Sequence, residues 1–338
     1  MRRRSFLALS AGFAASACAT RTRGEALGGG EALHRDFRDV AAPDAIVEEL
    51  GGGFGWAEGP IWIADRRCLL FSDVPGNVIR QWTPAGGVVE FLHPSGFAGA
   101  HAAHLRESGA NGLALDASGA LLMCDSGNRA LARLDLSTRE KTLICTQFSG
   151  RRFNSPNDLC VSHSGAVYFT DPPFGLAGMA ASPLKELPFS GVFRLDPDGA
   201  VQLIDDSLSF PNGIALSHDE RSLFVSNCDP AAAIIRAYAL DAAGAATGAS
   251  TFFDATSLIS ASAPGWPDGL KFDAAGRLFA CGPGGVLVLS PLGELLGRIH
   301  AGRAIANCAF GEDGHTLFLT ASDRLARIRL RTQGGPRS

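Results

Sequence analysis

Six side chains that carry an oxygen ligand recur along the chain, each at the start of a run of alternating apolar residues. Two are carboxylates and four are amides: Glu58, Asn111, Asn157, Asn212, Asp268 and Asn307. Hard divalent cations prefer such oxygen ligands. Histidine and cysteine are absent from these positions, which argues against a tetrahedral zinc centre. If the fold brought the six together, they would form a site for one divalent cation, Ca²⁺ first, with Mg²⁺, Mn²⁺ or Zn²⁺ as other occupants.

The charges of this set also indicate a cation. Glu58 and Asp268 would repel each other in a narrow channel unless a cation lay between them. Neutral amides would leave that cation electron-poor and therefore a usable Lewis acid. Asn-Gly and Asp-Gly are also ordinary turn dipeptides, and this alternative stays open for single copies, above all for Asn111 and Asn307.

The segments that follow these residues predict the elements that must position them. Each reads as a hairpin of two short strands, with turns such as residues 116–119 and 273–276, and a third strand often follows, as at 130–135 and 191–196. The copies lie about 40 to 55 residues apart, a period typical of propeller blades. We expect an all-β, six-bladed β-propeller forming a single domain over residues 46–332, with a β-sandwich of hairpins as the alternative. The first residue of each repeat would then line the same mouth of the central channel.

The N-terminus has the features of an export signal. Residues 1–17 combine a basic start, a short apolar stretch and Ala15-Ser16-Ala17, and Arg3-Arg4-Ser5-Phe6-Leu7 resembles the twin-arginine motif. Ala15-Ser16-Ala17-Cys18 is also similar to a lipoprotein box. We predict a periplasmic protein, with a lipid on Cys18 as the only membrane contact, and a flexible arm over residues 18–45. A cytoplasmic protein with an accidental basic start is the alternative.

Composition excludes several classes of protein. With 338 residues, 46% hydrophobic residues and a net charge of −4, the chain can build a core, and without a long basic run it has no feature of a nucleic-acid-binding protein. Outside the N-terminus, it has no apolar stretch long enough for a polytopic membrane protein. Cysteines other than Cys18 number seven, and no two have CxxC spacing, so we expect free core thiols, with one disulfide left open. A monomer or small homo-oligomer is expected.

Five motifs in this order resemble the SMP-30/gluconolactonase/regucalcin-like (SGL) family over nearly the whole chain after residue 46. They are Glu58-Gly59-Pro60, Asn154-Ser155-Pro156-Asn157-Asp158, Phe169-Thr170-Asp171-Pro172-Pro173-Phe174-Gly175, Pro211-Asn212-Gly213 and Pro267-Asp268-Gly269. The resemblance implies a six-bladed propeller that binds a divalent cation, often calcium, and in many members hydrolyses sugar lactones.

The resemblance also assigns roles to residues. The family's metal-binding Glu, Asn and Asp fall on Glu58, Asn212 and Asp268, and a metal or substrate contact falls on Asn157. Asp268 would also be the catalytic base. Regucalcin-type members carry a substrate-binding Arg where this chain has Ser155, so the substrate stays open.

The leading hypothesis is a metal-dependent lactonase. The cation would polarise the lactone carbonyl while Asp268 acts as base or orients the attacking water. Asn111 and Asn157 would bind substrate or water. His101 and His104 lie in a small-residue loop that would either contact substrate or be solvated.

Other functions and other side chains stay open. An organophosphate or other ester hydrolase using the same site is one alternative, and a non-enzymatic ligand-binding propeller is another. Trp56 and Trp266, close in sequence to the two carboxylates, could wall the pocket.

Overall fold

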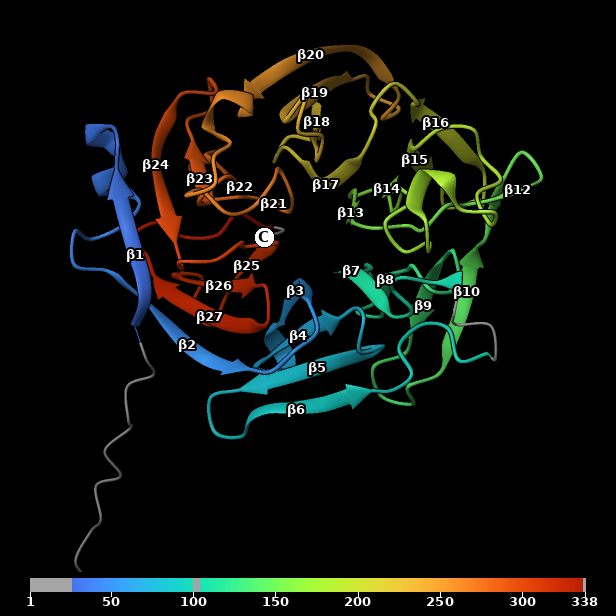
Figure 1. Ribbon diagram of the computed structural model, residues 1–338, viewed down its shortest axis with the longest axis horizontal. Helices are drawn as coiled ribbons and strands as arrows, with labels where there is room; N and C mark the ends of the chain where they lie inside the picture. Colours follow the sequence, from blue (N-terminus) through green and yellow to red (C-terminus); the bar gives the residue numbers. More distant parts are fainter. Residues whose placement is uncertain (1–25, 100–103, 337–338) are drawn as a thin grey trace, which may run out of the picture.

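The computed structural model describes residues 26–99 and 104–336, and these form a ring of antiparallel β-sheet units around a central channel (Figure 1). The all-β class predicted from the sequence is confirmed. The predicted signal peptide and Cys18 lie outside the described residues. Among the described residues, no helix is long and apolar enough to cross a lipid bilayer.

Each unit has four strands. In five units the strand numbers rise from the channel outward, and in the last unit β2 is the outermost strand. The first three units are β3 (Ala57–Ile63), β4 (Cys68–Asp73), β5 (Val78–Thr83) and β6 (Gly87–Leu92); β7 (Ala110–Leu115), β8 (Leu121–Asp125), β9 (Ala130–Leu134) and β10 (Lys141–Cys145); and β13 (Leu159–Val161), β14 (Val167–Asp171), β15 (Gly191–Leu195) and β16 (Val201–Asp205).

The other half of the ring has the same layout. Its units are β17 (Pro211–Leu216), β18 (Ser222–Asn227), β19 (Ile234–Leu240) and β20 (Ala246–Asp254); β21 (Leu270–Phe272), β22 (Leu278–Gly282), β23 (Gly285–Leu289) and β24 (Leu295–His300); and β25 (Asn307–Gly311), β26 (Thr316–Ala321), β27 (Arg324–Arg329) and β2 (Ile46–Gly52). Because β2 supplies the outermost strand of the last unit, the N-terminal part of the chain closes the ring.

The remaining described elements are short. They are β1 (Ala26–Ala32), the β11 (Gln147–Phe148) and β12 (Arg151–Arg152) ribbon, and the 3₁₀ turns η1 (Arg35–Asp39), η2 (Ala64–Arg66), η4 (Met179–Ala181) and η5 (Thr256–Leu258).

Residues 26–45 differ from the flexible arm expected over 18–45. Strand β1 pairs with β24 on one side and with β2 on the other, so it joins the last two units into one nine-stranded sheet. After it, Phe37 and Val40 are buried against the core of those units. The sequence analysis missed strand β1 because the strand is rich in glycine. Its pairing depends on backbone hydrogen bonds and not on apolar side chains, so it has no apolar alternation.

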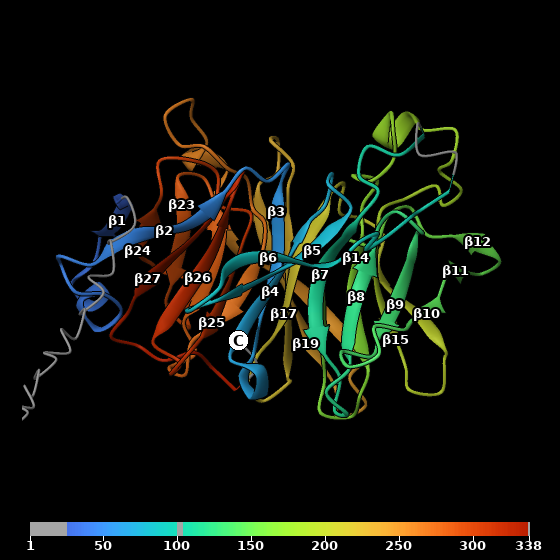
Figure 2. The ribbon, with the colours of Figure 1, turned by 90° about the horizontal axis from the view of Figure 1, so that it is seen from below.

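The core lies between the units. Each hydrophobic cluster combines residues of two neighbouring units, as where Trp62 of the first unit stacks on Phe318 of the last, 5.7 Å between ring centroids. The second strand β14 is buried throughout, whereas the outer strand β20 is mostly exposed. Figure 2 shows the units edge-on, with their strands running between the two faces of the ring.

Candidate functional site

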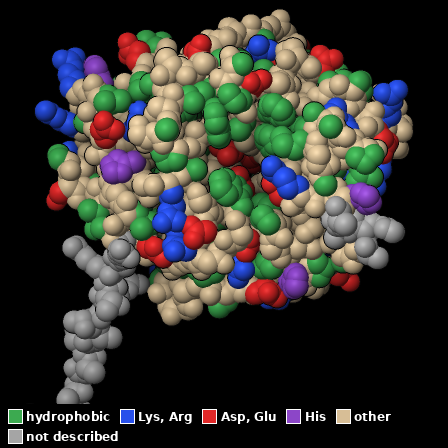
Figure 3. Space-filling view, viewed as in Figure 1, with side chains coloured by type: hydrophobic (Ala, Val, Ile, Leu, Met, Phe, Trp, Pro, Cys, Tyr) green, Lys and Arg blue, Asp and Glu red, His purple; other side chains and the backbone are tan. Residues whose placement is uncertain are grey.

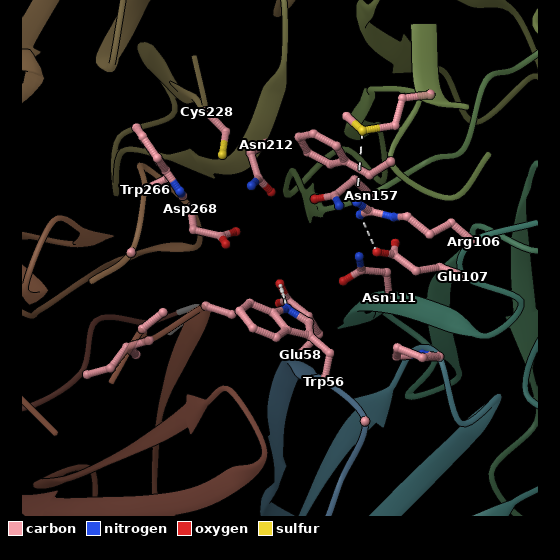
Figure 4. Close-up of a pocket in the computed structure, with 18 residues that line it drawn as sticks. Trp56, Glu58, Arg106, Glu107, Asn111, Asn157, Asn212, Cys228, Trp266 and Asp268 are labelled. Carbon is pink, nitrogen blue, oxygen red and sulfur yellow. Dashed lines mark hydrogen bonds and ion pairs between the residues drawn. The ribbon is translucent and has the colours of Figure 1, made fainter. Parts of the chain in front are cut away.

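One mouth of the central channel, which we call the upper mouth, opens into a cavity of about 480 Å³ that combines carboxylate and amide groups with apolar walls. Figure 3 looks into it and shows acidic side chains at the bottom of a hollow rimmed largely by hydrophobic ones. Figure 4 shows Glu58, Asn111, Asn157, Asn212 and Asp268 around this cavity. Five of the six repeat-start side chains therefore meet at one mouth, as their spacing predicted.

Asn307, the sixth repeat-start residue, does not line the cavity. It is buried, its Nδ2 donates to Asp158 Oδ2 at 3.3 Å, and its Oδ1 accepts from the Cys308 amide at 2.9 Å. Both ends of this amide are thus used inside the protein. The expectation of six converging ligands is wrong for Asn307, because Asp158 holds its side chain away from the cavity.

The glycines that follow the site residues mark close approaches between units. A Cβ on Gly213 would lie 2.1 Å from the Asp268 carbonyl oxygen, and one on Gly59 would lie 2.2 Å from that of Asn111. Strand pairing is also irregular here, between Glu58 and Ile61 and between Pro211 and Ile214. The Asn-Gly and Glu-Gly pairs are therefore not hairpin turns: they let neighbouring inner strands converge at the upper mouth.

Hydroxyl groups on second strands hold the site residues of the following unit. Thr170 Oγ1 donates to the Asn212 carbonyl at 2.6 Å, and Ser226 Oγ donates to that of Asp268 at 2.9 Å. All four residues except Asp268 are buried below one-tenth exposure. The third and fourth units thus each fix the backbone of a site residue in the next unit.

Carboxylates at the ends of second strands hold the loops that lead into the site. Asp171 accepts from the backbone amides of Asn154 and Ser155 at 2.7 and 2.8 Å. Asp73 accepts from the Gly55 amide at 2.9 Å, just before Trp56. These loops carry Asn157 and Trp56 into the cavity.

The two carboxylates of the site are held in an unfavourable environment. Burial, with the nearby Asp158 carboxylate, raises the pKa of Glu58 to about 8. Burial and the Glu58 charge raise the pKa of Asp268 well above its usual range. A cation between these groups would relieve both effects.

The unpaired amide oxygen of Asn212 also fits a cation. Its Oδ1 is buried and has no hydrogen-bond partner. Such an orphaned acceptor beside two carboxylates has the chemistry of a hard-cation ligand. The described residues contain no cluster of three or more His, Cys, Asp and Glu side chains that could hold a metal, so amides have to complete the ligand set. Glu58, Asn157, Asn212 and Asp268 therefore suit Ca²⁺ or Mg²⁺ better than a thiolate–imidazole zinc centre.

Several lining residues were missed by the sequence analysis. Arg106, Glu107, Phe174, Met179 and Cys228 line the cavity but start no repeat. They come from connections whose lengths differ between units, so no periodic pattern identifies them. Trp56 and Trp266 do wall the cavity, and Trp56 Nε1 donates to Glu58 Oε1 at 3.4 Å.

The other predicted contacts lie elsewhere. His101 falls outside the described residues, and His104 is exposed and absent from the cavity lining. Ser155, which stands where regucalcin-type relatives carry Arg, is buried, and its Oγ donates to the Pro172 carbonyl at 2.6 Å. It has a structural contact here and does not face the cavity.

All seven cysteines within the described residues are free. Four of them, Cys68, Cys124, Cys281 and Cys308, are buried, as expected for small core residues. Burial and the nearby Asp268 carboxylate raise the pKa of the Cys228 thiol to about 12, which keeps it protonated beside the site.

Comparison with known proteins agrees with this fold. The family model for the SMP-30/gluconolactonase/LRE-like region matches residues 56–323. A gluconolactonase of Zymomonas mobilis is 45% identical over 300 residues, which cover 88% of this chain and 83% of that protein.

Solved structures show the same similarity. The structure of a gluconolactonase from Xanthomonas campestris superposes with a TM-score of 0.77 and 32% identity, covering 93% of this chain and all of that one. A calcium-binding regucalcin from Agrobacterium tumefaciens shares the fold at 18% identity and a TM-score of 0.67, covering 85% of this chain and 95% of that one.

Proposed function

The chain belongs to the SMP-30/gluconolactonase/LRE-like family, and we propose that it is a sugar-lactone hydrolase that works with one divalent cation at the upper mouth. Glu58, Asn157, Asn212 and Asp268 would hold the cation. The six four-stranded units are, in this proposal, the six blades of a propeller. The single observation that carries the proposal is the meeting of two carboxylates that repel each other with an orphaned amide oxygen in one cavity.

The cation, when bound, supplies a Lewis acid that polarises the lactone carbonyl. The residues of the chain provide the rest. Asp268 takes a proton from, or orients, the water that attacks the carbonyl carbon. Asn111 and Asn157 donate hydrogen bonds from their amide groups to substrate or water, and Trp56 and Trp266 exclude bulk water from the cavity walls. Ca²⁺ is the proposed occupant, because all four ligands are oxygens of carboxylates or amides.

A panel of substrates shows whether the enzyme cleaves a lactone ester bond or a phosphoester bond. The protein lacking residues 1–17 is assayed, with Ca²⁺ present, against D-glucono-1,5-lactone and a phosphotriester, and the spontaneous rate of lactone opening is subtracted. We expect turnover of the lactone and little or none of the phosphotriester. Turnover of the phosphotriester alone would replace the lactonase with an organophosphate hydrolase, and no turnover of either by protein that binds the cation would contradict the proposal.

A further inference from the structure

Two charged side chains at the upper mouth have no part in the proposed chemistry. Arg106 and Glu107 lie in the connection between β6 and β7 and line the cavity. Figure 4 shows them across the cavity from Asp268 and Trp266, next to Asn111 and Asn157. A bound lactone whose carbonyl faced Asp268 would place the far side of its ring toward this pair.

The pair is held firmly by the protein. The backbone amides of Arg106 and Glu107 both donate to the Gly175 carbonyl, at 2.8 and 3.3 Å. The Arg106 guanidinium lies 6.0 Å from the Phe174 ring centroid and donates to the Glu107 carboxylate. The Glu107 side chain is only 13% exposed, and burial raises its pKa. The Arg106 side chain is 50% exposed, so the pair combines a largely buried carboxylate with a partly solvated guanidinium that the protein holds beside it.

Both groups keep hydrogen-bonding capacity toward the cavity. A guanidinium has five N–H donors, and a carboxylate has about four acceptor positions. The hydrogen bond between Arg106 and Glu107 uses one donor of the guanidinium and one acceptor position of the carboxylate. No described residue donates to Glu107 Oε2. Adjacent hydroxyl groups of a sugar ring both donate and accept, so they match an Arg–Glu pair that offers donors and acceptors side by side.

The charge of the cavity selects among hydroxylated ligands. Its lining carries three carboxylates, those of Glu58, Glu107 and Asp268, and one cation, Arg106. A divalent ion would bring this set to neutrality, so no lining cation would remain to balance a phosphate or carboxylate on the substrate. An uncharged ligand is therefore favoured over an anionic one.

We propose that Arg106 and Glu107 form a hydroxyl-binding subsite that makes the enzyme selective for uncharged, polyhydroxylated lactones. This inference rests on the proposed function, because it deepens the account of the same site. The Arg106–Glu107 pair would also supply, from another loop, a substrate contact that Ser155 cannot make. The Ser155 side chain donates its hydrogen bond to the Pro172 carbonyl.

The test compares lactones that differ only in their substituents. Wild type, Glu107→Gln and Arg106→Met are assayed with D-glucono-1,5-lactone, with δ-valerolactone, which has the same ring without hydroxyls, and with the 6-phosphorylated gluconolactone. We expect each variant to lower the kcat/KM ratio of gluconolactone over valerolactone by roughly tenfold to a hundredfold, the range for losing a hydrogen bond to a charged group. Wild type should prefer the uncharged over the phosphorylated lactone.

Binding of 1,5-anhydro-D-glucitol, measured by calorimetry, gives a readout that needs no turnover, because this sugar carries the ring hydroxyls and no carbonyl. Its Kd should rise by a similar factor in both variants. Arg329→Met, which breaks the exposed Arg329–Asp313 pair on β27, is the matched control and should leave every value unchanged.

Unchanged specificity ratios and an unchanged Kd would overturn the subsite, as would a wild-type preference for the phosphorylated lactone. If wild type hydrolyses no lactone, the proposed function fails instead. The Kd for anhydroglucitol in Glu107→Gln then still decides whether the subsite exists.

Discussion

The two mouths of the channel are built by the same first strands of the units and carry different polar groups. At the upper mouth, these strands begin with carboxylates and amides. At the other end, which we call the lower mouth, a second cavity of about 480 Å³ is lined mostly by apolar residues of the same strands, such as Ile61, Leu159 and Leu216. A few residues along one strand thus separate a cavity that gathers carboxylates and amides from a cavity whose one carboxylate is Asp116.

The difference shows where chemistry can be placed in this fold. An inner strand buried between two neighbours must be apolar along most of its length to stabilise the ring. Its first residues enter from a loop and can carry polar groups without disrupting the core. Asp158 lies between the mouths and is fully buried. Burial raises the pKa of Asp158, although the Lys271 charge partly offsets this effect. We infer that catalysis depends on the upper mouth and stability on the lower one.

The largest predicted effect comes from removing a charge at the upper mouth. Asp268→Asn keeps the shape of the side chain but removes the negative charge that would bind the cation and act as base, so we expect kcat/KM for gluconolactone to fall by roughly 10²–10⁴-fold. The circular dichroism spectrum should not change.

The matched control makes the same exchange at the lower mouth. Asp116 lines that cavity, and its Oδ2 accepts from Arg133 at 2.7 Å. Asp116→Asn should keep kcat/KM within about twofold of wild type, since its charge is remote from the cation ligands. Equal losses in the two variants would refute the division between the mouths.

A cavity-forming change at the lower mouth should have the reverse outcome. Leu216 is 8% exposed and belongs to the core between the third and fourth units. Leu216→Ala should lower the free energy of unfolding by about 2–5 kcal/mol in urea titrations, because it removes buried apolar contacts. Activity per folded molecule should stay close to that of wild type. A large drop in kcat under conditions in which the variant is fully folded would show that the two mouths are coupled.

A smaller effect is expected from the hydroxyls that position the ligands. Thr170→Val removes the hydrogen bond to the Asn212 carbonyl while keeping the shape of the side chain. We expect the Kd for Ca²⁺ to rise about tenfold to a hundredfold by calorimetry, the range for residues that orient metal ligands. Thr142→Val on the exposed strand β10 is the control. An unchanged Kd in Thr170→Val would mean that the neighbouring unit does not position Asn212.

The sequence predicted those parts of the molecule that repeat. The hairpins and their turns, such as residues 116–119, follow from apolar alternation interrupted by Asp and Gly, and the structure confirms them. The third strand at 130–135 is confirmed as β9. Outer strands such as β10 were missed, because an exposed edge needs no apolar alternation.

The same reasoning explains which site residues could be found in advance. Glu58, Asn111, Asn157, Asn212 and Asp268 occupy equivalent repeat positions, so their convergence followed from the period. Arg106 and Glu107 come from the connection between β6 and β7, which differs in length from the corresponding connections between the other units, so the period does not reveal them. Asn307 obeys the period but is held elsewhere by Asp158, a contact between residues far apart in sequence that no local pattern reveals.

The central claim is that a divalent cation at the upper mouth is required for lactone hydrolysis, and one measurement tests it most directly. Gluconolactone hydrolysis is followed in protein stripped with a chelator, then after adding back Ca²⁺, Mg²⁺, Mn²⁺ or Zn²⁺ singly, with the spontaneous rate subtracted. The account predicts that stripped protein has no activity above the spontaneous rate and that Ca²⁺ restores it in wild type but not in Asp268→Asn. Full activity in protein shown to be free of metal would contradict it.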